Sequence, residues 1–198
     1  MAAFPRRRLL IASAMGVLAP IGLARAAEDV RGSLPSLAFR MQRADDERIM
    51  SETDLRGSVV LLYFGYTFCP DLCPTTLANL AAILDRLGAL AARTRVLFVT
   101  VDPARDTAEV LRQFIAPFGP GFIALRPTPD ALAAAARRYR VAYSVQPAAP
   151  GQPYAVSHGA GVYVFDPTGA ARTILTGLEQ PSPDIDAAAA AVRQAVRT

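Results

Sequence analysis

The chain has 198 residues, of which 52% are apolar, and it carries a formal net charge of +4 at pH 7. This apolar content suits one globular domain with a substantial core and excludes a disordered protein. Four of the 21 basic residues and none of the 17 acidic ones lie in residues 1–26, so the remainder is neutral. A neutral body lacks the basic surface that binds phosphate backbones, and we expect no nucleic-acid partner.

The first 26 residues have the pattern of an export signal. A basic cluster precedes an apolar run, residues 9–24, which ends in the small-x-small cleavage pattern Ala24-Arg25-Ala26. The run is short for a bilayer span and a proline interrupts it. A cleaved signal peptide is therefore favoured over an uncleaved segment that anchors the protein to the inner membrane. The letters RRRLL also fit a twin-arginine signal, although the general export route stays open.

Cleavage after Ala26 would leave residues 27–198 as the mature domain. The destination of such a signal in a bacterium is the periplasm, where disulfides can form and persist. We therefore expect an exported, periplasmic protein.

Strands and helices are predicted to alternate along the mature chain. Short strands at 37–41 and 47–50 are joined by a polar turn. Continuous apolar runs at 58–64 and 95–101 are typical of strands buried on both faces. In chain order, the remaining predictions are helices at 75–92 and 107–118, a strand at 122–125, a helix at 130–141, a hairpin at 161–177 that turns at DPTG, and a helix at 185–196. This order predicts a single α/β domain with a mixed sheet flanked by helices.

Both cysteines lie in one stretch, GYTFCPDLCPTT, at residues 65–76. They follow a buried strand and precede a helix, which is where open α/β sheets place functional sites. Pro74 is expected at the first helical position, and the positive end of the helix is expected to lower the pKa of Cys73. A structural disulfide is disfavoured, because a Cys69–Cys73 bridge closes a loop of only five residues. Thiolates attack disulfides and also bind metals, so a redox pair and a metal site both stay open.

His158 is the single histidine of the chain. A lone histidine is more often a hydrogen-bonded surface residue than a metal ligand. With Cys69 and Cys73 it would form a set of two sulfurs and one nitrogen, which suits trigonal Cu(I) and leaves Zn(II) one ligand short. The sequence places His158 at the start of the late hairpin, after a Pro/Gly-rich loop at 144–153 that we expect to be mobile. Spacing alone does not bring it to the cysteines.

Three stretches, YFGYTFCPDLCPTTL, VTVDPARDT and SHGAGVYVFDPTG, resemble the Sco/SenC family of copper-binding, thioredoxin-fold proteins. The resemblance implies a thioredoxin-like sheet and one copper ion, as Cu(I), Cu(II) or both, with Cys69, Cys73 and His158 as ligands. It further implies a metallochaperone for assembly of the copper centre of cytochrome c oxidase. The implied partner is an oxidase subunit or another copper-accepting protein.

The same family resemblance leaves a second function class open. Cys69 and Cys73 could cycle between dithiol and disulfide, which would make the protein a thiol–disulfide oxidoreductase acting on cysteines of an oxidase subunit or another partner. Because a disulfide has no thiolate to offer a metal, a thiol reductant would then be a further partner.

Three aspartates are expected near these residues. Asp71, between the cysteines, either stabilises the start of the helix by its charge or interacts with a bound metal. Asp102 is a candidate to support the site without binding the metal itself. Asp106 is predicted to cap the helix at 107–118.

Overall fold

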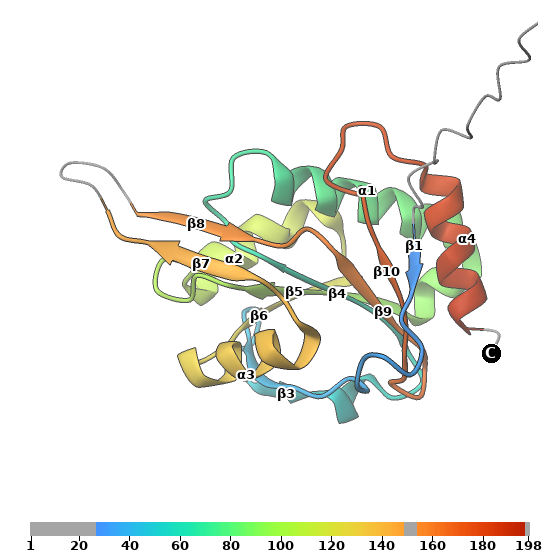
Figure 1. The fold of residues 1–198 in the computed structure, drawn as a ribbon, viewed down its shortest axis with the longest axis horizontal. Helices are drawn as coiled ribbons and strands as arrows, with labels where there is room; N and C mark the ends of the chain where they lie inside the picture. The colour runs from blue at the N-terminus through green and yellow to red at the C-terminus, as the bar shows by residue number, and fades with distance from the viewer. Residues whose placement is uncertain (1–26, 149–153, 197–198) are drawn as a thin grey trace, which may run out of the picture.

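The computed structural model describes residues 27–148 and 154–196. Its centre is an eight-stranded mixed sheet in the order β1-β10-β9-β4-β5-β6-β2-β3 (Figure 1). Within it, β4 pairs in parallel with β5 and β5 with β6, while the other neighbours are antiparallel. The strands are β1 (Ala27–Asp29), β2 (Arg40–Arg43), β3 (Ile49–Ser51), β4 (Val59–Gly65), β5 (Thr94–Thr100), β6 (Phe122–Arg126), β7 (Tyr143–Gln146), β8 (Ala155–His158), β9 (Val162–Phe165) and β10 (Ala171–Leu175). The signal peptide predicted for residues 1–26 lies outside the described residues.

Helices cover both faces of this sheet, and Figure 1 shows α1 and α4 on the face opposite to α3. In the described part of the chain the helices are α1 (Leu72–Leu87), α2 (Ala108–Ile115), α3 (Pro129–Tyr139) and α4 (Ile185–Val196), with short 3-10 helices η1 (Glu52–Leu55), η2 (Gly88–Arg93) and η3 (Ala116–Phe118). None of these helices combines the length and the apolar character needed to cross a bilayer.

Strand β4 divides the core into two layers. All of its residues are buried, and alternate side chains point to opposite faces of the sheet. Leu61 and Tyr63 pack with residues of α1, α2 and α4, whereas Leu62 and Phe64 pack with residues of α3. The apolar run that predicted a strand buried on both faces is therefore confirmed, and so is the single α/β domain with a mixed sheet.

Helix α1 begins earlier and ends earlier than predicted. It starts at Leu72, so Pro74 occupies the third helical position and not the first. It ends at Leu87, and a 3-10 helix follows where a continuous helix to residue 92 was expected. The glycine at position 88 has φ of 59°, which L-residues with side chains adopt rarely, and this explains the break.

The predicted cap of α2 is wrong by one residue. Thr107 is the N-cap, and its hydroxyl accepts a hydrogen bond from the Val110 backbone N–H at 3.3 Å. Asp106 is instead fully buried, and its carboxylate accepts hydrogen bonds from the hydroxyls of Thr67 and Thr100. Burial raises the pKa of Asp106, while these hydrogen bonds act against the increase. Asp106 therefore ties the loop after β4 to the end of β5.

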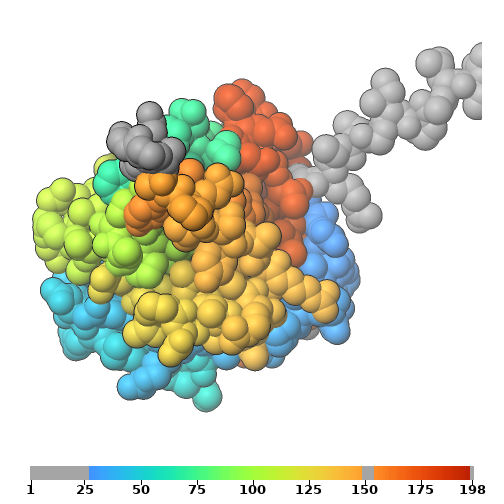
Figure 2. Space-filling model, turned by 60° about the vertical axis from the view of Figure 1, so that its left-hand side comes forward, coloured from blue at the N-terminus to red at the C-terminus, as the bar shows by residue number. Residues whose placement is uncertain are grey.

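A second, two-stranded sheet consists of β7 and β8 alone, with Tyr143 opposite His158. This hairpin corrects the loop predicted at 144–153, because strand β7 extends to Gln146; residues 149–153 lie outside the described residues. It also corrects the place of His158, which ends β8 and does not open the following strand. Figure 1 shows the hairpin extending past the main sheet, and Figure 2 shows it (orange) at the surface of the molecule.

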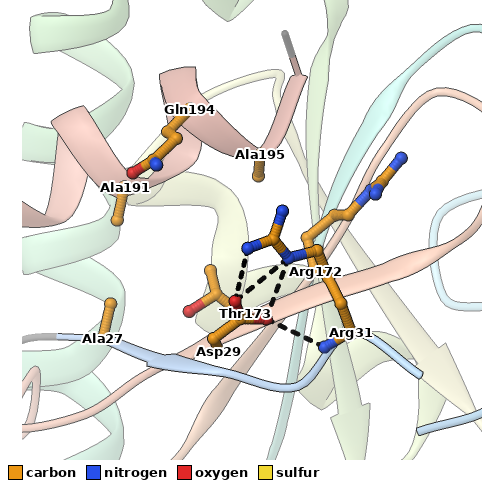
Figure 3. A pocket seen from close by; sticks show the side chains of 8 residues that line it. All are labelled: Ala27, Asp29, Arg31, Arg172, Thr173, Ala191, Gln194 and Ala195. Carbon is orange, nitrogen blue, oxygen red and sulfur yellow. Dashed lines mark hydrogen bonds and ion pairs between the residues drawn. The ribbon is translucent and has the colours of Figure 1, made fainter. Parts of the chain in front are cut away.

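A cavity of about 180 Å³ lies at the other end of the fold, between β1, β10 and α4 (Figure 3). The charges that line it are compensated within the chain, because Arg31 pairs with Asp29 and Arg172 pairs with Asp166. The cavity shares no lining residue with the cysteine loop or the hairpin.

Candidate metal centre

The two cysteines lie where β4 gives way to α1. Cys69 belongs to the loop and Cys73 to the first turn of the helix; both are buried free thiols. The end of β4 makes room for them, because a Cβ at Gly65 would lie 2.8 Å from the Cys73 sulfur. Real Cβ atoms essentially never approach a neighbour so closely, so the absence of a side chain here allows the sulfur to lie against the strand.

His158 reaches the same place from β8. Its Nε2 lies 3.2 Å from the Cys73 Sγ. Its Nδ1 lies 3.0 Å from the Gly159 carbonyl oxygen, which can only accept a hydrogen bond, so Nδ1 carries the proton in this contact. Nε2 of the neutral ring then has its lone pair directed at Cys73, and this lone pair is what a metal would need.

The three side chains form one cluster of potential metal ligands. Both sulfurs and the imidazole nitrogen lie within 4.8 Å of one another. Donors around a three-coordinate ion with metal–sulfur bonds of about 2.3 Å would be roughly 4 Å apart, so small shifts suffice to enclose an ion. The residues brought together are those that the sequence singled out, Cys69, Cys73 and His158. The donor set is soft, as Cu(I) prefers.

Burial disfavours the charged forms of Cys73 and His158. It raises the pKa of the Cys73 thiol to about 12, while a hydrogen bond from Tyr63 acts in the opposite direction. Burial also lowers the pKa of His158, against hydrogen bonds with backbone carbonyls that raise it. The predicted lowering of the Cys73 pKa by the helix is therefore wrong, because desolvation of the thiolate outweighs the helix terminus. An entering metal ion has to displace the thiol proton.

Two tyrosines, Tyr63 of β4 and Tyr66 of the cysteine loop, lie beside this cluster. The Tyr63 hydroxyl donates to the Cys73 sulfur at 3.5 Å. The Tyr63 and Tyr66 rings meet the His158 ring edge to face, with centroids 5.9 and 5.7 Å apart. Nothing in the sequence spacing of these two tyrosines identifies them as neighbours of a histidine from another sheet.

The two aspartates proposed as supporting residues have different positions. Asp71 is exposed at the N-cap of α1 and its carboxylate makes no capping hydrogen bond. Asp102 is 3% exposed, and it accepts hydrogen bonds from the Tyr154 hydroxyl at 2.6 Å and from Arg105. Neither aspartate belongs to the ligand cluster found among the described residues.

A mixed sheet with two cysteines at the start of its first long helix, one in the preceding loop and one in the first turn, joined by a histidine from a separate hairpin, defines a thioredoxin-like protein with a two-sulfur, one-nitrogen centre. Comparisons with known proteins agree with this class. The sequence model of the SCO1/SenC family matches residues 35–196. The chain therefore belongs to the SCO1/SenC family.

Relatives in eukaryotes are similar over most of the domain. Protein SCO2 homolog, mitochondrial, of Bos taurus is 34% identical over 178 residues, which are 83% of this chain and 67% of that protein. Protein SCO1, mitochondrial, of Saccharomyces cerevisiae is 39% identical over 121 residues, 60% of this chain and 41% of that protein. The matched region thus spans two thirds of the first relative and less than half of the second.

Solved structures of the same kind have the same fold. Bradyrhizobium japonicum ScoI with copper bound has a TM-score of 0.69 at 28% identity, covering 80% of this chain and 98% of that chain. Yeast Sco1 with copper bound has a TM-score of 0.67 at 33% identity, covering 77% and 86%. These matches confirm the thioredoxin-like fold.

Proposed function

We propose that this protein is a copper metallochaperone that binds one copper ion through Cys69, Cys73 and His158. The observation that carries the proposal is the convergence of these three donors within 4.8 Å, from the loop and helix after β4 and from the separate β7–β8 hairpin. Two similar structures hold copper, which supports the choice of metal. The ion is cargo: it is bound and passed on, with assembly of the copper centre of cytochrome c oxidase as the purpose and an oxidase subunit as the recipient.

The two thiolates favour binding of Cu(I), and the imidazole allows the site to bind Cu(II) as well. Two soft sulfurs can hold Cu(I) without further help, whereas Cu(II) needs the harder nitrogen. Both thiols are buried, so an ion that binds there loses most of its water. Burial lowers the pKa of His158, so the neutral imidazole does not repel the cation.

A thiol–disulfide oxidoreductase remains the second candidate, since both cysteines are free thiols in a thioredoxin-like fold. It is less favoured, because an attacking thiol needs to be accessible and ionised. Both thiols are buried, and burial raises the pKa of Cys73 to about 12. This chemistry is better suited to displacement of a proton by a metal than to attack on a partner's disulfide.

Export to the periplasm is part of the proposal. It is supported by the basic cluster, apolar run and Ala24-Arg25-Ala26 pattern of residues 1–26. A thiol reductant in that compartment would keep Cys69 and Cys73 ready for copper. Mass spectrometry of the protein from its native host checks the prediction: a chain that begins at Ala27 supports export with cleavage, and an intact chain in the membrane fraction supports the anchor.

Copper titration of the reduced protein under anaerobic conditions tests the function. We expect one Cu(I) per chain, loss of tight Cu(I) binding in Cys69→Ser and Cys73→Ser, and weakened Cu(II) binding with Cu(I) retained in His158→Ala. Ser157→Ala is the matched control, because Ser157 is the exposed neighbour of His158 and its hydroxyl is hydrogen-bonded to that of Ser144 in the same hairpin. Unchanged binding of both ions in Cys73→Ser contradicts the proposal.

A further inference from the structure

We propose that Arg105 is a positioning residue of the metal centre: it fixes the β7–β8 hairpin to the cysteine loop and thereby places His158. The inference rests on the proposed function, because the side chains that it places are the proposed copper ligands. Arg105 itself follows β5 and belongs to neither ligand-bearing segment.

The guanidinium of Arg105 contacts Asp102 and Tyr154, the residue that directly precedes β8. Its Nε donates to the Asp102 carboxylate, and its Nη1 donates to the Tyr154 carbonyl oxygen at 3.0 Å. The guanidinium also lies 3.7 Å from the centroid of the Tyr154 ring. The Tyr154 hydroxyl donates a hydrogen bond to the Asp102 carboxylate at 2.6 Å, so each of the three residues contacts the other two. Because Asp102 is almost fully buried, this ion pair is poorly screened by water.

The other neighbours of the guanidinium come from the cysteine loop. Its central carbon lies 5.0 Å from the Phe68 ring centroid and 5.9 Å from that of Tyr66. Phe68 directly precedes Cys69, and the Tyr66 ring contacts His158. Nη2 is buried without a hydrogen-bond partner among the described residues, so the aromatic rings and the two other nitrogens hold the group in place.

The hairpin needs such an attachment. It pairs with no strand of the main sheet in the described structure, and a two-stranded hairpin alone is marginally stable in water. Tyr154 lies immediately before β8, whose last residue is His158. An anchor at Tyr154 therefore fixes the beginning of the strand that carries the imidazole at its end.

The consequence for copper differs between the two oxidation states. Cys69 and Cys73 lie in the loop and helix that follow β4, outside the hairpin, so we expect Cu(I) held by the sulfurs to tolerate its loosening. Cu(II) depends on the imidazole and loses affinity whenever His158 leaves the cluster. A residue that merely stabilised the fold would affect both ions together.

The test compares Arg105→Gln and Arg105→Lys with Arg138→Gln in the reduced, full mature chain. Arg138 is the matched control, because its guanidinium also lies over a tyrosine ring, that of Tyr139, and also donates to a backbone carbonyl, that of Ser36. It lies on α3, away from the metal centre. Affinities for Cu(I) and Cu(II) are measured separately, and the environment of Cu(II) is followed by its thiolate absorption and electron paramagnetic resonance.

In Arg105→Gln we expect Cu(II) affinity to fall by about tenfold to a hundredfold, as for other residues that orient metal ligands, while Cu(I) affinity stays unchanged. In the copper-free protein, amide hydrogen exchange of β8 should accelerate. Arg105→Lys should show the same losses, because an ammonium cannot donate to Asp102 and to the Tyr154 carbonyl in one plane. Arg138→Gln should leave both measurements as in the wild type.

The inference is overturned if Arg105→Gln changes neither the hydrogen exchange of β8 nor the affinity for Cu(II). It is also overturned if Arg105→Lys behaves like the wild type while Arg105→Gln loses Cu(II) affinity, because the effect would then come from the charge alone. If Arg105→Gln does not fold, Tyr154→Ala removes the ring and the hydroxyl from the same contact and must give the same two changes. The proposed function fails separately: the wild-type chain would then bind no copper, although β8 exchange would still respond to Arg105.

Discussion

Gly65 is the residue on which the approach of Cys73 to the sheet depends. A Cβ at this position would lie 2.8 Å from the Cys73 sulfur and 2.7 Å from a ring carbon of Phe98. The Phe98 ring is fully buried and packs against Tyr63, so it has little freedom to move away. A side chain at Gly65 therefore has to displace either the core or the sulfur.

We expect Gly65→Ala to lower the free energy of unfolding by about 1–3 kcal/mol, the usual cost of overpacking, and to weaken Cu(I) binding as well. Gly159→Ala is the matched control beside His158, because its new methyl group would lie 3.9 Å from the Ala142 carbonyl oxygen, an ordinary van der Waals contact. Urea denaturation and Cu(I) competition measure the two effects. Equal stability of both variants would show that the end of β4 is looser than the structure indicates.

Single residues also show what the sequence can and cannot predict about the site. Cys69 and Cys73 lie in one motif beside a recognisable strand, so their place followed from local pattern alone. His158 lies 85 positions after Cys73, and only the resemblance to a family connected it to the cysteines. The contact of Tyr66 with His158 and the guanidinium of Arg105 over the Tyr154 ring had no signal in the sequence, because they depend on how a separate hairpin packs.

The β9–β10 hairpin is an element whose turn is stabilised by one carboxylate. Asp166 is buried, and its Oδ1 accepts hydrogen bonds from the backbone N–H of Thr168 at 2.8 Å and of Ala170 at 3.0 Å. Its Oδ2 accepts from Arg172 at 2.7 Å. Burial raises the pKa of Asp166, but the hydrogen bonds from Thr168 and Arg172 outweigh burial, so the pKa lies below its usual range.

The lowered pKa fixes the direction of the pH dependence. A carboxyl group with a lower pKa in the folded than in the unfolded state stabilises the fold above its unfolded pKa of about 3.9. This stabilisation is lost as pH falls through the folded value. We expect Asp166→Asn to lower the free energy of unfolding by about 1–3 kcal/mol at pH 7, and by progressively less below about pH 4. Urea denaturation between pH 7 and pH 3 measures this, and a difference that stays constant over the range contradicts it.

Two hairpins show why some elements were predictable and others were not. The turn DPTG lies between β9, which is buried throughout, and β10, in which buried residues alternate; it is a strong local signal, and the structure confirms that hairpin. Strand β7 is only four residues long and every residue after Tyr143 is exposed, so its alternation is too short to mark it as a strand. Its neighbours rich in proline and glycine then favoured a loop. Likewise, adjacent Asp106 and Thr107 can both cap a helix, and only the burial of Asp106 decides between them.

At the scale of the whole molecule, we expect copper binding by the proposed ligands to depend on the redox state of the two cysteines. Cys69 in a loop and Cys73 in the first helical turn are both free thiols, and a disulfide between them would leave no thiolate for copper. We expect the oxidised protein to bind neither Cu(I) nor Cu(II) tightly, and reduction to restore one ion per chain. Thiol quantification beside copper titration measures this. Equal copper uptake by both forms would mean that the sulfurs are not the ligands.

Copper that joins the cysteine loop to β8 is a crosslink between the main sheet and a hairpin that has no strand pairing with it. The affinity of the complete three-ligand site then depends on how often the hairpin is docked before the ion binds. The apparent affinity equals the affinity of the docked state multiplied by the fraction of molecules that are docked. A hairpin docked for about a tenth of the time would weaken that affinity about tenfold. Substitutions far from the sulfurs can therefore tune how long Cu(II) stays bound, and a recipient protein that lifts the hairpin would remove the imidazole and leave the ion on the two sulfurs alone.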